Sequence, residues 1–209
     1  MRSAFWASCV LALGCGACGR VGYDVIAISS GGGGTGGTVT VDGGTCVDAG
    51  APCGSVRVQY HAGDQNKPTD AWIRLQLNLY NDSSADIPLV ELVVRYWYTI
   101  DTVAPQVFTC DTASVGAAGC GNVTGTFASV SPPRTGADSV IEIGFLAAAG
   151  ALMAGGQTQP ILMRVNKTDF SAYDEPGDYS YDATSSAYVD DPRITVYRNG
   201  PLVWGVEPP

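Results

Sequence analysis

Ile73-Arg74-Leu75-Gln76-Leu77-Asn78-Leu79-Tyr80 is the clearest strand pattern in the chain. Apolar residues occupy every second position of this stretch, and polar or amphipathic residues occupy the positions between them. Successive side chains of a strand point to opposite faces of a sheet, so the pattern predicts one strand with a core face and a polar face.

Similar short runs, bounded by Gly, Pro, Asn and Asp, follow on the C-terminal side of Ser55. They cover residues 92–100, 123–130, 140–146, 161–165, 194–198 and 202–204. Asn199-Gly200 between the last two runs predicts a tight β-hairpin, and Pro201 suits the first residue of an edge strand. No helical period appears after the N-terminal segment. The sequence therefore predicts an all-β fold, a sandwich of two antiparallel sheets with about eight or nine strands.

The length, charge and composition of the chain limit the classes of function that it can have. The chain has 209 residues and a net charge of -9, which is enough for one folded domain with additional segments. Only 11 residues are Lys or Arg, and no basic run occurs, so nucleic acid is excluded as a partner. The low charged fraction of 15%, with abundant Gly, Ser, Thr, Asn and Tyr, is typical of secreted β proteins.

Residues 1–18 are predicted to be a signal or lipoprotein segment. Arg2 precedes an apolar run over residues 4–13, which is shorter than the roughly 20 residues that cross a bilayer. Small residues precede both Cys15 and Cys18, as in a bacterial lipoprotein processing site, so either cysteine is a candidate for lipidation. The protein is then exported, as an outer-membrane or cell-surface lipoprotein that contacts the membrane only through its lipid, or otherwise is secreted.

The two processing sites leave different numbers of cysteines to form disulfides. Seven cysteines in an exported protein should mostly pair. Cleavage before Cys18 leaves four cysteines after the lipidated one, whereas cleavage before Cys15 leaves Cys18 as a free thiol. The four remaining cysteines pair as Cys46 with Cys53 and Cys110 with Cys120. Zinc is disfavoured because no Cys-x-x-Cys motif recurs and His61 is the only histidine.

Residues 19–54 are predicted to be a flexible linker because glycine is concentrated there among Ser, Thr, Asp and Ala. Such a segment forms no core of its own. It separates the folded region, residues 55–209, from the anchored end of the chain.

Residues 164–181 mix aromatics, carboxylates, amides and one guanidinium. Aromatic rings cover the C–H face of a sugar, amides and Arg bind its hydroxyls, and clustered Asp oxygens suit a hard cation. The same composition fits a solvated loop with core tyrosines equally well.

Calcium has its own candidate ligands. Thr99 and Asp101 end the strand that contains Tyr96-Trp97-Tyr98, and the loop after residue 173 supplies Asp174, Gly177 and Asp178. If these segments meet, hydroxyl, carbonyl and carboxylate oxygens converge as Ca²⁺ prefers. The alternative is ordinary turn capping by Asp and Thr.

Catalysis is not predicted. A single histidine excludes most His-based triads, and His61 is read as a surface residue. Glu142 lies in an alternating strand and faces either a groove or solvent. A glycosidase needs two facing carboxylates, and no second Glu occupies a comparable strand, so Glu142 is assigned a structural role.

Residues 56–208 resemble a family 3 carbohydrate-binding module, the cellulose-binding sandwich of bacterial cellulases and scaffolding proteins. The matching stretches are Val58-Gln59-Tyr60, Arg95-Tyr96-Trp97-Tyr98-Thr99, Asn122-Val123-Thr124-Gly125, Gly136-Ala137-Asp138 leading into Ile141-Glu142-Ile143-Gly144-Phe145, and Leu202-Val203-Trp204-Gly205. The resemblance implies a non-catalytic, monomeric jelly-roll sandwich with a structural Ca²⁺ and a flat face that lies on crystalline cellulose. The calcium positions of the family match Thr99, Asp101, Asp174 and Asp178, while Gly177 replaces an Asn and Asp174 replaces a neutral residue.

The resemblance also implies a glycan-binding face at Asp111, Thr112, Arg164 and Phe170. Asp111 and Arg164 match the family, but Thr112 stands where an aromatic belongs and Phe170 replaces a Trp. The loop over 113–121 is short, and Cys110 with Cys120 closes it as in shorter members. Two functions follow: a surface-anchored module that binds cellulose or a related β-glucan, or a structural or interaction module of the same fold that recognises another glycan or a protein partner.

Overall fold

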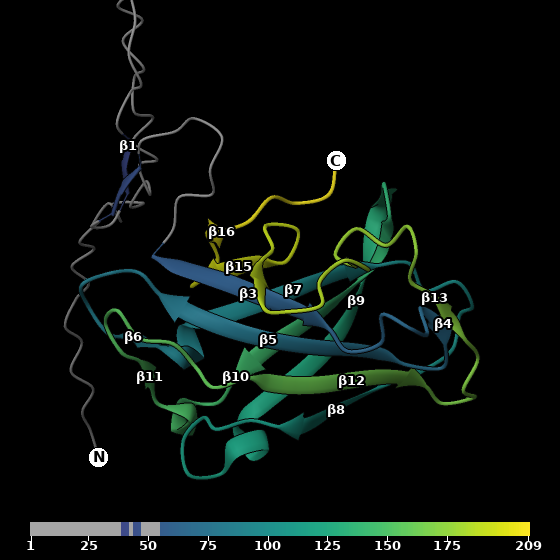
Figure 1. Cartoon of the computed structure of the whole chain (residues 1–209), viewed down its shortest axis with the longest axis horizontal. Helices are drawn as coiled ribbons and strands as arrows, with labels where there is room; N and C mark the ends of the chain where they lie inside the picture. The colour runs from purple at the N-terminus through teal and green to yellow at the C-terminus, as the bar shows by residue number, and fades with distance from the viewer. Residues whose placement is uncertain (1–38, 42–43, 47–54) are drawn as a thin grey trace, which may run out of the picture. The chain divides into compact units, whose positions relative to one another are not determined.

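The computed structural model describes residues 39–41, 44–46 and 55–209 (Figure 1). The predicted signal segment 1–18, with Cys15 and Cys18, lies outside the described residues, and so does one half of the predicted Cys46–Cys53 pair. Within the predicted linker, the structure describes an antiparallel hairpin of β1, Val39–Val41, and β2, Gly44–Cys46. No helix of the described residues has the length and apolar character that a membrane span requires.

Two five-stranded antiparallel sheets form the sandwich (Figure 1). The first has the strand order β16-β15-β7-β10-β9 and the second the order β14-β3-β5-β12-β8. The strands of the first sheet are β7 Leu92–Tyr98, β9 Val123–Arg134, β10 Ala137–Phe145, β15 Thr195–Arg198 and β16 Leu202–Trp204. Those of the second are β3 Val56–Ala62, β5 Ile73–Asn81, β8 Gln106–Thr112, β12 Ile161–Lys167 and β14 Val189–Asp190.

Smaller elements connect these strands. Two further sheets have two strands each, β6 Ile87–Pro88 with β11 Ala151–Leu152, and β4 Thr69–Asp70 with β13 Tyr173–Asp174. Single turns of 3₁₀ helix are η1 Leu89–Glu91, η2 Gly119–Asn122 and η3 Ala147–Ala149.

The alternation predicted for residues 73–80 is confirmed in β5. Its four apolar side chains, Ile73, Leu75, Leu77 and Leu79, are at most 1% exposed and face the first sheet across the core. Burying one such side chain stabilises the fold by roughly 1.5–3 kcal/mol, so this strand alone contributes strongly to the cohesion of the two sheets. The side chains of Arg74, Gln76 and Tyr80 on its other face are only partly buried.

The predicted sandwich is confirmed, with ten strands in its two main sheets where about eight or nine were expected. The edge strand β8 was missed because most of its side chains are only partly buried, and its sequence shows no apolar alternation. The predicted hairpin at Asn199-Gly200 is confirmed. Both residues have positive φ, at 51° and 107°, and they join β15 to β16 at the edge of the first sheet.

Candidate functional site

Arg164 and Asp111 meet on the outer face of the second sheet. Arg164 lies on β12, in register with Arg74 on β5 and Thr109 on β8. The register between β12 and β8 shifts near Cys110, so the pairing is irregular next to Asp111. Asp111 Oδ1 lies 3.4 Å from Arg164 Nε, and both side chains remain partly exposed. The structure thus brings two of the four predicted glycan contacts together as a surface ion pair.

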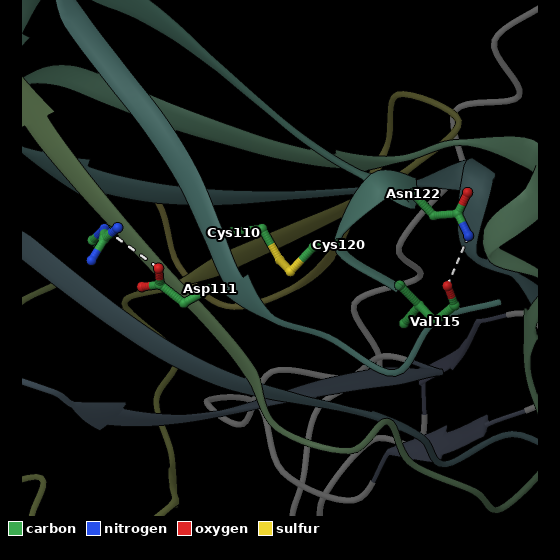
Figure 2. The surroundings of a disulfide bond; sticks show 6 residues. Cys110, Asp111, Val115, Cys120 and Asn122 are labelled. Carbon is green, nitrogen blue, oxygen red and sulfur yellow. Dashed lines mark hydrogen bonds and ion pairs between the residues drawn. A yellow bond between two sulfur atoms is a disulfide. The ribbon is translucent and has the colours of Figure 1, made fainter. Parts of the chain in front are cut away.

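The loop after Asp111 is held at both ends (Figure 2). A disulfide joins Cys110 to Cys120, with their Cα atoms 5.5 Å apart. The buried Asn122 side chain donates a 2.8 Å hydrogen bond from Nδ2 to the carbonyl of Val115. Thr112 is exposed and pairs with Leu162 of β12. It offers a hydroxyl to a ligand but no ring for stacking.

Phe170 projects from a tight turn that follows β12. Its backbone N–H donates to the carbonyl of Lys167 at 3.0 Å, and Lys167 Nζ donates to the carbonyl of Ala172 at 2.8 Å. Phe170 adopts φ 56°, a left-handed conformation that is costly for a bulky residue. The residue is 59% exposed. The turn therefore places a large apolar ring in solvent at a cost in backbone strain, which is common at binding sites.

Trp72 is the residue that the sequence reasoning missed. Its ring centroid lies 5.9 Å from that of Phe170, and the Arg164 guanidinium carbon lies 5.1 Å from the Trp72 ring. The backbone N–H of Trp72 donates a 2.6 Å hydrogen bond to Asp70 Oδ1, which fixes the turn into β5. A signal was present, because Trp72 precedes Arg74 by two residues and so extends the polar face of that strand.

The pairing of β4 with β13 brings these aromatic residues together. Tyr173 is in register with Asp70, and Asp174 with Thr69, so the turn that carries Phe170 returns beside Trp72. We call Trp72, Asp111, Arg164 and Phe170 the aromatic corner from here on.

The candidate calcium ligands converge on the end of β7. Asp178 Oδ1 accepts hydrogen bonds from the Thr99 backbone N–H at 2.8 Å and from Thr99 Oγ1 at 2.6 Å. Asp101 Oδ2 accepts from the Asp174 N–H at 2.9 Å. Asp138 lies on the neighbouring strand β10, and its Oδ1 accepts from the Ile100 N–H at 2.8 Å. Asp138 was not among the predicted residues.

The fit to a cation depends on Asp178, which is 4% exposed and whose Oδ2 has no hydrogen-bond partner. Burial is the main reason that the pKa of its carboxyl is raised to about 7; the hydrogen bonds from Thr99 oppose the rise, and the charges of Asp101 and Asp138 add to it. A buried carboxylate oxygen without a donor, next to two further carboxyls, is the environment that a hard cation stabilises.

Asp174 differs from the predicted arrangement in the direction of its side chain. Its carboxylate accepts a 2.8 Å hydrogen bond from Thr69 Oγ1, and only its backbone N–H contacts Asp101. Among residues 39–41, 44–46 and 55–209, no three His, Cys, Asp or Glu side chains form a metal-binding group. A cation at this site would therefore be held by Asp101 and Asp178 together with hydroxyl and carbonyl oxygens of Thr99, Gly177 and their neighbours.

The two remaining candidates for chemistry have structural partners. Glu142 on β10 forms a 2.7 Å ion pair with Arg95, its cross-strand neighbour on β7. His61 Nδ1 lies 3.0 Å from Gln76 Oε1 on the adjacent strand, and its ring contacts Tyr188. The polar contacts of Glu142 and His61 are thus with residues on neighbouring strands.

Residues 57–205 match the family model for the cellulose binding domain. The chain belongs to this family. A xyloglucanase of Paenibacillus sp is 40% identical over 157 residues, which are 75% of this chain and 15% of that protein. The anti-sigma-I factor RsgI4 of Acetivibrio thermocellus is 41% identical over 154 residues, 74% of this chain and 28% of that protein. The cellulose binding domain therefore corresponds to a minor part of both relatives.

Solved structures agree with the family assignment. Biomass-sensing modules from RsgI-like proteins of Clostridium thermocellum give a TM-score of 0.69 at 39% identity, with 74% of this chain and 99% of that chain covered. A family IIIa CBD from Clostridium cellulolyticum gives a TM-score of 0.69 at 34% identity, with 76% and 100% covered. The resemblance to family 3 carbohydrate-binding modules is thus confirmed, and with it the class of fold and the non-catalytic, carbohydrate-binding character of the family.

Proposed function

We propose that this cellulose binding domain binds β-glucan, with cellulose as the reference ligand, through the aromatic corner. The observation that carries the proposal is the contact of Trp72, Phe170 and Arg164 on one exposed face. The rings offer apolar surface to the C–H groups of glucose, and Arg164 and Asp111 offer hydrogen bonds to its hydroxyls.

The rest of the chain supports a tethered module. The apolar N-terminal segment with Cys15 and Cys18 suits export followed by lipidation, and the glycine-rich residues 19–54 suit a spacer between the anchor and the glycan. A monomer that reaches away from the cell surface would hold the cell, or an enzyme in the same assembly, close to the polysaccharide. In this proposal, Ca²⁺ bound by Asp101 and Asp178 stabilises the fold and takes no part in glycan contact.

Removal of Phe170 is expected to weaken glucan binding about tenfold, because a desolvated stacked ring contributes on the order of 1 kcal/mol or somewhat more. The measurement compares depletion isotherms of wild type, Phe170→Ala and Arg164→Ala on amorphous cellulose. Leu202→Ala is the matched control, since Leu202 is 43% exposed but lies on β16 of the other sheet. Isotherms unchanged by both Phe170→Ala and Arg164→Ala would exclude the aromatic corner as the binding face.

A further inference from the structure

The two rings of the aromatic corner do not share a plane. The planes of Trp72 and Phe170 are inclined by 59°, with their centroids 5.9 Å apart. One face of the Trp72 ring is covered by the Arg164 guanidinium at 5.1 Å. A crystalline cellulose surface is flat, and a ring stacks on it only when the ring lies parallel to that surface. Two rings inclined at this angle cannot both do so, and at most one of them can contact a crystal face fully.

The surface beside the aromatic corner is hollow as well as angled. A pocket of about 520 Å³ is lined by residues 61–67 and Arg74. Arg74 neighbours the aromatic corner, because it is in register with Arg164 and lies two residues after Trp72. The lining includes the polar side chains of His61, Asn66 and Lys67, which suit sugar hydroxyls. A planar crystal would bridge over this pocket without contacting its walls.

A single glucan chain fits this angled and hollow surface better than a flat crystal does. Free of its lattice, such a chain can bend and rotate about its glycosidic bonds, so neighbouring glucose units present their faces in different directions. Inclined rings can then stack on two neighbouring glucose units. We propose that the aromatic corner, extended by the pocket at Arg74, recognises single, non-crystalline β-glucan chains in preference to crystalline cellulose. This inference rests on the proposed function and specifies its ligand.

The test compares depletion isotherms of the full chain on regenerated amorphous cellulose and on microcrystalline cellulose, normalised to accessible surface. Calorimetry with cellohexaose reports binding to a single soluble chain. We expect at least tenfold higher affinity for amorphous than for crystalline cellulose, and measurable binding of cellohexaose. Trp72→Ala is expected to lower the affinity for amorphous cellulose about tenfold, while Trp72→Phe retains most of it. Leu202→Ala again serves as the control.

The outcomes separate this inference from the function on which it rests. Equal or tighter binding to microcrystalline cellulose would overturn the preference for single chains and leave β-glucan binding intact. If the wild-type chain binds no β-glucan although a cooperative thermal transition shows that it is folded, both the single-chain preference and the proposed β-glucan binding are overturned. If Trp72→Ala proves unfolded by circular dichroism, the ratio of the two wild-type isotherms decides the preference for single chains without any variant.

Discussion

Chelation of calcium is expected to lower the Tm of the folded domain by about 5–10 °C. Calcium that binds only the native state adds about 2.7 kcal/mol of stability at a free concentration 100 times its Kd. For a domain of this size, each kcal/mol shifts the Tm by roughly 2–4 °C. The physical reason lies in Asp178, whose buried Oδ2 has no hydrogen-bond donor and whose pKa is raised to about 7 by desolvation. A bound cation would compensate the charge that burial disfavours.

Differential scanning calorimetry in about 1 mM Ca²⁺ and in excess EGTA measures this difference. At about 1 mM Ca²⁺, a site of micromolar affinity is full. Asp178→Asn is expected to abolish most of the calcium-dependent gain while retaining the hydrogen bonds from Thr99, because the amide oxygen still accepts them. Asp174→Asn is the matched control, since its carboxylate contacts Thr69 and should matter little. A wild-type Tm that is insensitive to EGTA would refute calcium binding, and a full gain in Asp178→Asn would refute these ligands.

The sandwich was predictable because its strands are long enough to show their period. Ile73 to Leu79 alternate without interruption, and every apolar member of the run is buried in the core. The edge strand β8 shows no such pattern, since an edge strand that is only partly covered selects no regular spacing of apolar residues. Periodicity therefore identifies the central strands β5, β7, β10 and β12 and misses this peripheral one.

The candidate site was predictable only in part, because its geometry depends on contacts between distant segments. Resemblance to the family gave Asp111 and Arg164, which do meet. It did not give Trp72, because the approach of Trp72 to Phe170 depends on the pairing of β4 with β13. Those strands have two residues each, which is too few to carry a pattern.

The sequence also did not predict in which direction the candidate ligand side chains point. Asp174 occupies a ligand position by resemblance, yet its carboxylate accepts a hydrogen bond from Thr69 and its backbone N–H contacts Asp101. Asp138 shares the electrostatic environment of Asp178, although it lies far from residues 174–178 in the sequence. The sequence indicates which loops carry candidate oxygen ligands. Only the folded structure determines which of those oxygen atoms converge on one site.

Gly136→Ala is expected to destabilise the domain by about 3 kcal/mol or more, since it combines backbone strain with a steric clash. Gly136 forms the turn between β9 and β10 with φ 69°, a conformation that costs an L-residue about 1–2 kcal/mol. A Cβ at this position would lie 2.5 Å from the carbonyl oxygen of Gly177 and 2.9 Å from the backbone nitrogen of Tyr179. Both atoms belong to backbone, so neither can move aside as a flexible side chain would.

Gly155→Ala separates the two contributions, because Gly155 has nearly the same φ, 65°, while a Cβ there meets nothing within 4 Å. This control should lose only about 1–2 kcal/mol, the cost of strain alone. Urea unfolding of both variants with saturating Ca²⁺ gives the difference in the free energy of unfolding. Equal losses would show that the loop at Gly177 yields to the added methyl group.

The same substitution also tests whether the turn at Gly136 supports the candidate calcium site. Displacement of Gly177 would shift the adjacent Asp178, whose Oδ1 depends on two hydrogen bonds from Thr99. Gly136→Ala should therefore lose most of the calcium-dependent gain in Tm, whereas Gly155→Ala should keep it. A full calcium response in Gly136→Ala would mean that the ligands keep their positions when the turn is forced apart, and would limit the role of Gly136 to close packing.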